Sequence, residues 1–279
     1  MRGLCGQVSA AAAGVARRFA AILALVLLML VTPNAAVPAE PVEPPQPKYG
    51  WREVWAGTDA MRDVWLLYSG VTLAPWSDHI YDPGVRLRMQ AGYGRYDYTL
   101  YEDGAYHHYL GEVTTTDALI GYHWRFGELT AKVFGGVAMI DRQGKSSTEH
   151  AHIFGLEYGP KGVLELWLNV SEQSWTSLNL SYTTAHETAS GRWRFGYKIF
   201  DDISIGPELR FDTSDFRPAG RDGFFDQYLG RAGLFLTYKM PGLEFAFAGG
   251  VATRFRGIDP EQGADGLSHY GTVNVLFQY

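Results

Sequence analysis

The final eleven residues of the chain, HYGTVNVLFQY, alternate between apolar and mostly polar side chains. In an extended strand, residues two apart point to the same side, so this segment has one apolar face. The apolar face carries Val273, Val275, Phe277 and Tyr279, and the other face carries Thr272, Asn274, Leu276 and Gln278. The segment therefore predicts a strand with one face in an apolar environment, as in a soluble sandwich or in a membrane barrel.

The same alternation recurs in residues 84–93, 191–200, 203–212 and 243–255. Charged side chains there fall almost wholly on the face opposite the large apolar ones; Leu87, for example, alternates with Arg86 and Arg88. No window after residue 50 shows a convincing 3.6-residue period, and the chain is rich in glycine (33) and tyrosine (17). These features predict an all-β fold of many short strands, either a sandwich or a barrel.

Residues 1–39 are predicted to be a secretory signal peptide. Basic residues precede the apolar run FAAILALVLLMLV (19–31), which is shorter than the roughly 20 residues that a helix needs to cross a bilayer. Small residues at 37–39 predict cleavage before Glu40. A cut after Ala36, or retention of the run as a short membrane anchor, are the alternatives.

The mature chain is predicted to contain no thiol, because the single cysteine, Cys5, precedes the apolar run. Disulfides and cysteine-based metal sites are therefore excluded. Residues 40–50 form a Pro-rich lead-in that is suited neither to helix nor to interior strand, and we expect it to lie in the periplasm. Residues 51–279 are left for the β domain, and they hold no continuous apolar span of the kind that forms a membrane helix.

Turn signals divide the β domain into twelve predicted strands. These are 50–60, 63–74, 84–99, 107–126, 128–141, 150–170, 175–186, 191–199, 203–213, 226–240, 243–256 and 268–279. Connections after even strands are mostly short, whereas those after odd strands are longer and more polar, as in RGIDPEQGADGLS. Short turns on one rim and long loops on the other are typical of outer-membrane barrels. Two connections break this pattern, because 76–83 is long for a turn and 61–62 is short for a loop.

Residues 150–170 are predicted to form one strand, although Gly159-Pro160 looks like a turn. A hairpin at that point would direct Glu165 toward lipid, where a carboxylate is costly. The sequence thus predicts an antiparallel, up-and-down transmembrane β-barrel of about twelve strands, placed in outer-membrane lipid. The final strand, which ends on an aromatic residue, looks like the closing strand of such a barrel.

Seven short blocks occur in a fixed order through this domain. They are WAGTD (55–59), LYSG (67–70), GYGRY (92–96), LIGYHW (119–124), KVFGG (132–136), IGPE (205–208) and AGG (248–250). In order and spacing they resemble the bacterial cellulose biosynthesis protein BcsS family over most of residues 51–279. The resemblance implies an outer-membrane protein that accompanies cellulose production and secretion, with synthase or export components, or the cellulose chain, as partners. It supplies no catalytic motif and no cofactor.

The face opposite the apolar one is predicted to line the barrel lumen, and its basic residues outnumber its acidic ones although the formal net charge is −6. The candidate lining residues are Arg86, Arg88, Arg125, Lys132, Glu165, Arg192, Arg194, Glu208, Arg210, Arg231, Glu244 and Arg254. Lys161, Lys198, Lys239, Asp117, Glu157 and Asp212 share this predicted face. Either the charges pair and plug the lumen, or they line a narrow channel for anionic or polar solutes.

Aromatic residues on the apolar faces near predicted turns are expected to lie at the membrane interfaces. These are Trp124, Phe126, Trp193, Tyr197 and Tyr238. Loop aromatics are better candidates for contact with sugar rings, namely Tyr101, Tyr106, Phe216, Phe224 and Phe225.

An enzyme that hydrolyses membrane lipid needs a serine and a histidine within hydrogen-bond reach. Candidates near the predicted loops are Ser146, Ser147, His150, His152, His186, Ser268 and His269, but no GxSxG motif is present. His150-x-His152 and His107-His108 are weak candidates for metal binding because no further ligands accompany them. We therefore expect no catalysis, no metal and no cofactor.

A pI near 5.7 and the absence of a basic run argue against nucleic-acid binding, and no phosphate-binding loop is present. The sequence predicts a non-enzymatic accessory of cellulose biosynthesis. A small solute-conducting pore and a lipid-modifying hydrolase are the alternatives.

Overall fold

The structure, a computed structural model, describes residues 50–279 except 63, 103–104, 147–152, 217–224 and 257–266. The chain divides into two units, Met1–Pro45 and Gln46–Tyr279, and every described residue belongs to the second. The predicted signal peptide and nearly all of the Pro-rich lead-in lie outside the described residues, as do Ser147, His150, His152 and Phe224. The side chains of Tyr101, Tyr106, His107, His108, Ser146, Phe216, Phe225 and Arg254 lie outside the description as well.

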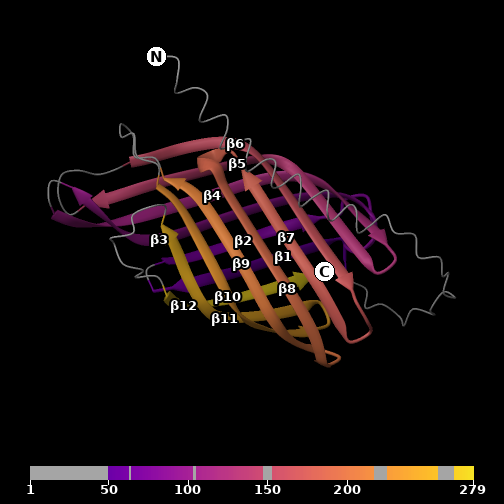
Figure 1. Ribbon diagram of the computed structural model, residues 1–279. Helices are drawn as coiled ribbons and strands as arrows, with labels where there is room; N and C mark the ends of the chain where they lie inside the picture. The colour runs from indigo at the N-terminus through magenta and orange to yellow at the C-terminus, as the bar shows by residue number, and fades with distance from the viewer. Residues whose placement is uncertain (1–49, 63, 103–104, 147–152, 217–224, 257–266) are drawn as a thin grey trace, which may run out of the picture. The chain divides into compact units, whose positions relative to one another are not determined.

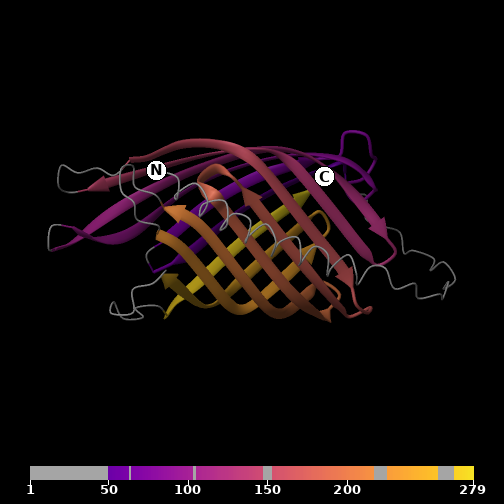
Figure 2. The same ribbon diagram turned by 45° about the horizontal axis from the view of Figure 1, so that its top comes forward.

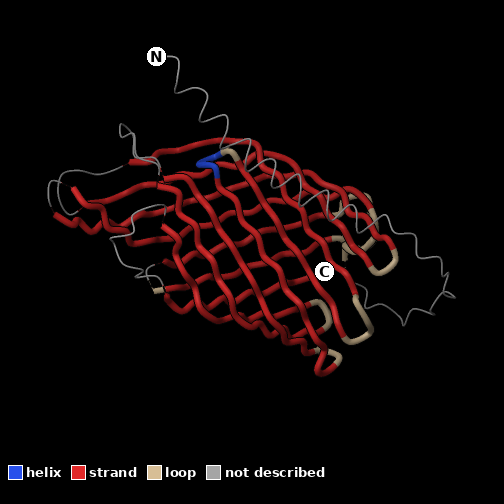
Figure 3. The backbone as a smooth tube through the Cα atoms, in the orientation of Figure 1, coloured by secondary structure: helices blue, strands red, loops and turns tan. Residues whose placement is uncertain are grey.

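Within the described residues, twelve antiparallel strands close into a barrel (Figures 1 and 3). They are β1 (Arg52–Met61), β2 (Val64–Leu73), β3 (Gly84–Glu102), β4 (Ala105–Phe126), β5 (Leu129–Ser146), β6 (Ile153–Asn169), β7 (Ser174–Thr183), β8 (Thr188–Phe200), β9 (Ile203–Phe216), β10 (Phe225–Met240), β11 (Leu243–Arg256) and β12 (Leu267–Gln278). Each strand pairs with its neighbour in the chain, and β12 pairs with β1 to close the sheet. The strands run obliquely across the barrel (Figure 2), as closure of a sheet requires. The predicted fold class is confirmed.

The predicted strand boundaries agree with the structure to within a few residues. β6 passes through Gly159 and Pro160 without a turn, so the prediction of one strand there is confirmed. β3, β4 and β5 run a few residues further toward the long-loop rim than predicted. β7 ends at Thr183 rather than at residue 186, because residues 185–187 form the short helix η1 (Ala185–Glu187).

Large apolar side chains cover the outer surface of the barrel. Leu67, Met89, Ile120, Val137, Tyr158 and Leu234 are each at least half exposed. On β12 the alternation seen in the sequence is reproduced, since Val273 and Phe277 are exposed whereas Thr272 is buried. A soluble sandwich would bury its apolar face instead, so this surface is typical of a barrel that meets lipid. Among the described residues, no helix has the length and apolar character to span a membrane.

The predicted interfacial aromatics are all exposed on the outside, although Trp193 lies in the middle of β8 rather than near a turn. Its indole nitrogen donates to Thr176 Oγ1 over 3.0 Å, which satisfies a donor that faces the apolar exterior. Nearer the turn, Tyr197 donates from its hydroxyl to Gln173 Oε1 over 2.7 Å. At Trp193 the neighbouring strand β7 thus supplies the acceptor that a mid-strand indole needs.

An aromatic core fills part of the interior. The rings of Trp167 and Trp175 stack with their centroids 4.1 Å apart, and Trp175 also meets Phe235 at 5.3 Å. Gly196 lies directly across from Trp175, and a Cβ atom built there would stand 2.2 Å from the Trp175 ring. A side chain at 196 would therefore displace the ring, which explains the glycine.

Candidate functional site: the charged interior of the barrel

The strand register brings polar residues from six neighbouring strands into one continuous row on the inner face. Directly paired residues share a face in an antiparallel sheet. The row, called the polar row below, consists of Lys132, Glu165, Asn179, Arg192, Arg210 and Arg231, on β5 to β10 in order. The barrel wall therefore carries three arginines side by side on β8, β9 and β10.

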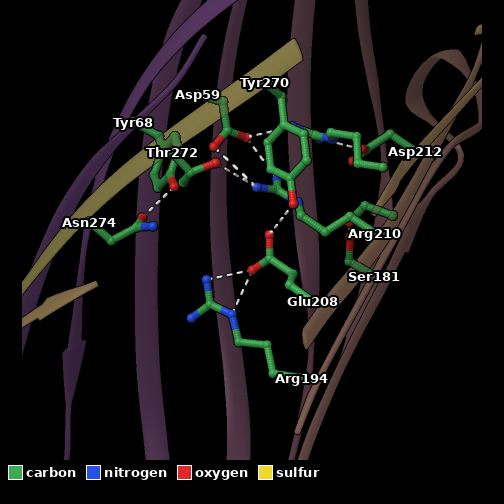
Figure 4. Close-up of polar contacts among 12 residues, drawn as sticks. Asp59, Tyr68, Ser181, Arg194, Glu208, Arg210, Asp212, Tyr270, Thr272 and Asn274 are labelled. Atoms are coloured by element: carbon green, nitrogen blue, oxygen red, sulfur yellow. Dashed lines mark hydrogen bonds and ion pairs between the residues drawn. The ribbon is translucent and has the colours of Figure 1, made fainter. Parts of the chain in front are cut away.

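Asp59 on β1, which is separated from β10 by β11 and β12, reaches this row across the interior (Figure 4). Its carboxylate accepts two hydrogen bonds from Arg210, at 3.1 and 2.7 Å, and one from Arg231 Nη1 at 3.3 Å. Arg231 also donates to Asp212. Asp59 and Arg231 are both buried, so the two guanidinium groups share a carboxylate away from water. Because β1 and β9 are not neighbours in the sheet, these bonds brace the barrel from within.

Glu208 forms the second half of the same group of side chains. Its carboxylate is fully buried and pairs with Arg194, whose Nε donates over 2.6 Å and whose Nη2 lies 2.5 Å from Glu208 Oε2. Tyr270 on β12 donates its hydroxyl to Glu208 Oε1 over 3.2 Å, again from another part of the wall. We call Asp59, Arg194, Glu208, Arg210, Asp212, Arg231 and Tyr270 the Asp59 cluster.

A second group lies at the other end of the polar row. Arg88 pairs with Glu165, and its guanidinium lies 4.7 Å from the Trp55 ring and 5.4 Å from the Phe134 ring. The Arg88 and Glu165 side chains keep 17% and 25% of their accessible surface. We call Arg88, Glu165, Lys132 and Trp55 the Glu165 cluster. Its ion pair is closed on one side by aromatic rings and remains open on another.

Arg86 holds the long connection between β2 and β3 against the turn-side end of the barrel. Its buried side chain donates to the carbonyl oxygens of Ile80, at 2.9 Å, and of Asp82. It also lies 3.1 Å from His123 Nδ1, and Ile80 itself is almost fully buried. The connection 74–83, which is unusually long for a turn, therefore folds against the inner face of the barrel.

The turn between β7 and β8 folds inward at the opposite rim. Ala185 and His186 are buried, and the backbone nitrogen of His186 donates to Glu157 Oε2 over 2.7 Å. Gly159 leaves the space that this requires, since a Cβ there would lie 2.2 Å from Thr184 Oγ1. Burial, together with the nearby Arg142, lowers the pKa of His186 below its usual value although Glu157 acts in the opposite direction.

The candidate catalytic pairs within the described residues do not meet. The ring nitrogens of His186 contact Glu157 and the carbonyl oxygen of Gly155, and not a serine. Ser268 and His269 are consecutive on β12 and so point to opposite faces of the sheet. Among the described residues, no group of three His, Cys, Asp or Glu side chains could hold a metal ion.

The predicted lining residues do not all come together. Arg88, Lys132, Glu165, Arg192, Arg194, Glu208, Arg210 and Arg231 lie in or beside the two clusters, and Arg86 lies at the turn rim. Glu244, which meets Lys239 at 3.4 Å, and the exposed Arg125 also lie near that rim, away from the clusters. The side chain of Arg254 is not described.

Sequence reasoning missed Asp59, Tyr270, Arg142 and His123, all of which are buried. Asp59 lies among small residues in the first strand, and a lone carboxylate gives no signal of the partners that it meets across a barrel. Counting the alternation from Trp55 places Asp59 on the same face, and this was the available clue.

Solved structures with a similar fold are barrels. The transport unit of the autotransporter AIDA-I from Escherichia coli aligns with a TM-score of 0.52 and 11% identity, over 88% of this chain and 95% of that one. The TodX deltaS2S3 mutant, a monoaromatic hydrocarbon channel, aligns with a TM-score of 0.50 and 9% identity, over 82% of this chain and 90% of that one. These likenesses concern the fold alone.

A comparison with curated proteins gives no match. The profile of the family described as "Cellulose biosynthesis protein BcsS" matches residues 54–279, which include nearly all of the barrel. This chain therefore belongs to the cellulose biosynthesis protein BcsS family.

Proposed function

We propose that this protein is a non-enzymatic barrel of the outer membrane that acts as an accessory in bacterial cellulose biosynthesis and secretion. The family match over residues 54–279 supports the cellulose context, and the apolar outer surface supports insertion into lipid. In this proposal residues 1–39 are cleaved as a signal peptide and residues 40–50 form a periplasmic lead-in. Its partners are outer-membrane lipid and either synthase or export components or the cellulose chain.

The internal bracing favours an accessory over a conduit, and this observation carries the proposal. Asp59 joins β1 to β9 and β10, and Glu208 on β9 joins β8 to β12. At the two rims, the 74–83 connection and the η1 turn fold against the inner face. A barrel that is cross-linked in this way presents its rims and outer surface to partners.

The proposal is tested by deleting the gene and measuring cellulose in two fractions, the total made and the part retained at the cell surface. We expect less surface cellulose in the deletion strain and recovery when the wild-type chain is supplied. Co-purification of synthase or export subunits with the tagged barrel would support the scaffold role. Unchanged cellulose in both fractions, with the synthase active, would contradict it.

Membrane placement needs a separate test. Detergent-extracted outer membrane is run on a gel before and after boiling, and a folded barrel changes its migration. If the protein is instead released as a soluble species by osmotic shock, the outer-membrane assignment is wrong.

A small solute-conducting pore is the second candidate, because Arg88 and Glu165 keep accessible surface inside the barrel. Planar-bilayer recordings separate the two roles. The accessory role predicts no steady conductance, whereas a stable conductance with a preference for anions would favour the pore.

A further inference from the structure

The three neighbouring arginines of the polar row are unequally compensated. Like charges directly opposite one another destabilise a sheet. Arg210 and Arg231 share Asp59, and Arg231 has Asp212 in addition. Arg192, which pairs in register with Arg210 and lies two residues from Arg194, receives neither carboxylate. Among the described residues, Arg192 therefore lacks the close carboxylate that its two neighbours in the row have.

Among the described residues, no carboxylate lies within ion-pair distance of Arg192. Glu208 and Glu165 both act on the Arg192 charge from a distance, but Glu208 makes its close ion pair with Arg194 and Glu165 makes its close ion pair with Arg88. Arg192 instead contacts Asn179, whose side-chain oxygen accepts from Arg192 Nη2 at 2.9 Å when the amide is oriented toward the arginine. A neutral amide does not cancel the positive charge of the guanidinium, so Arg192 keeps a charge that no adjacent carboxylate neutralises.

Arg192 keeps part of its access to solvent. Arg192 and Asn179 point into the barrel but are only partly buried, and the adjacent Glu165 keeps 25% of its side-chain surface. Arg194 and Arg231, by contrast, are buried. Arg192 thus combines the lack of a close carboxylate with partial accessibility to solvent.

We propose that Arg192 is an anion-binding residue that takes a small oxyanion, a phosphate or a carboxylate, into the barrel interior. The planar guanidinium fork matches two oxygens of such a group, and Asn179 fixes its orientation from the neighbouring strand. Arg194 and Arg210 reinforce the positive potential on either side. This anion site does not depend on the proposed role in cellulose biosynthesis, so the two proposals are tested separately.

The test uses the folded full-length barrel in detergent and titrates inorganic phosphate by calorimetry at constant ionic strength. Acetate is the carboxylate probe. We expect saturable binding to one site in the wild type and at least about tenfold weaker binding in Arg192→Gln, which corresponds to about 1.4 kcal/mol. The matched control is Arg95→Gln, on the outer face beside Glu112, which should bind as the wild type does. Response to phosphate but not acetate assigns the site to phosphate, and the reverse assigns it to carboxylate.

Gel migration before and after boiling shows whether each variant is folded. If Arg192→Gln does not fold, the wild-type barrel is crystallised with selenate, whose anomalous signal locates the anion. We expect the selenate against the Arg192 guanidinium. Absence of saturable binding by the wild type, equal binding by Arg192→Gln, or selenate only elsewhere would each overturn the proposal.

Discussion

The Asp59 cluster and the Glu165 cluster both hold charged side chains inside the barrel, but they compensate those charges in different ways. In the Asp59 cluster, carboxylates on β1 and β9 meet arginines on neighbouring and distant strands, and Glu208 is fully buried. In the Glu165 cluster, one carboxylate meets one arginine that rests on aromatic rings, and both charges keep some accessible surface. The same residue types thus form a network with a buried centre, Asp59 and Glu208, in one half of the interior and a partly accessible pair in the other.

This difference determines how much each ion pair should matter. Removal of one partner from a buried pair leaves an uncompensated charge, which costs several kcal/mol. A partly solvated pair loses little, because water replaces the missing partner. The contrast therefore predicts an order of effects.

The largest effect is expected for Asp59→Asn, which leaves Arg210 and Arg231 without their shared carboxylate. We expect a loss of about 3–5 kcal/mol in the free energy of unfolding, measured by urea titration with gel migration as the readout. Adding Arg210→Met to this variant should recover part of the loss, since it removes one of the orphaned charges. The matched control is Asp141→Asn, which loses only an exposed hydrogen bond to Gln143. A loss no greater than that of the control would contradict the bracing role of Asp59.

The next effect concerns Glu208. Glu208→Gln removes the charge that pairs with Arg194 but keeps an oxygen for Tyr270, so we expect a loss of about 2–3 kcal/mol. Tyr270→Phe removes the single hydroxyl donor and should cost about 1 kcal/mol. The same urea titration, applied to both single variants and to the double variant, measures their coupling. Strict additivity would mean that the two side chains do not act together.

Glu165→Gln should cost about 1–2 kcal/mol, less than Asp59→Asn, because the Glu165 and Arg88 side chains are mostly buried but keep part of their access to solvent. The cost should shrink further at about 0.5 M salt, since screening acts on charges that water reaches. Urea titrations at low and high salt check this expectation. If Glu165→Gln destabilises the barrel as much as Asp59→Asn does, the distinction between the clusters is wrong.

The smallest effect is expected at the rim, where His186 is buried beside Arg142 and Glu157. Its pKa in the folded chain is lowered, so in acid the unfolded chain takes up the proton more readily than the folded one. The docked turn should therefore lose stability as the pH falls below about 6.5, the ordinary histidine value. Unfolding midpoints at neutral and acidic pH, compared between the wild type and His186→Gln, isolate this contribution. An identical pH dependence in the two proteins would remove His186 as its source.

Much of the architecture was predictable because the alternation of apolar and polar residues in a barrel strand can be read from the residues of that strand alone. The alternation in β3, β8, β9 and β11 placed bulky apolar residues outside and most charges inside, and in β12 it placed apolar residues outside and polar ones inside, as the structure has them. The long β6 was predictable as well, because a turn at Gly159 would have directed Glu165 outward. The end of β7 was not, since the inward fold of residues 185–187 depends on contacts with Glu157 and Gly159 on another strand.

The sequence by itself determined which face of each strand is charged, because a period of two follows from strand geometry alone. Which charges meet was decided only by the tertiary structure. Asp59 and Arg210 are 151 residues apart in the chain, and Arg192, next to Arg210 in register, makes no ion pair with a carboxylate of the described residues. Pairing across a lumen depends on the stagger and closure of the whole sheet, which no single strand encodes.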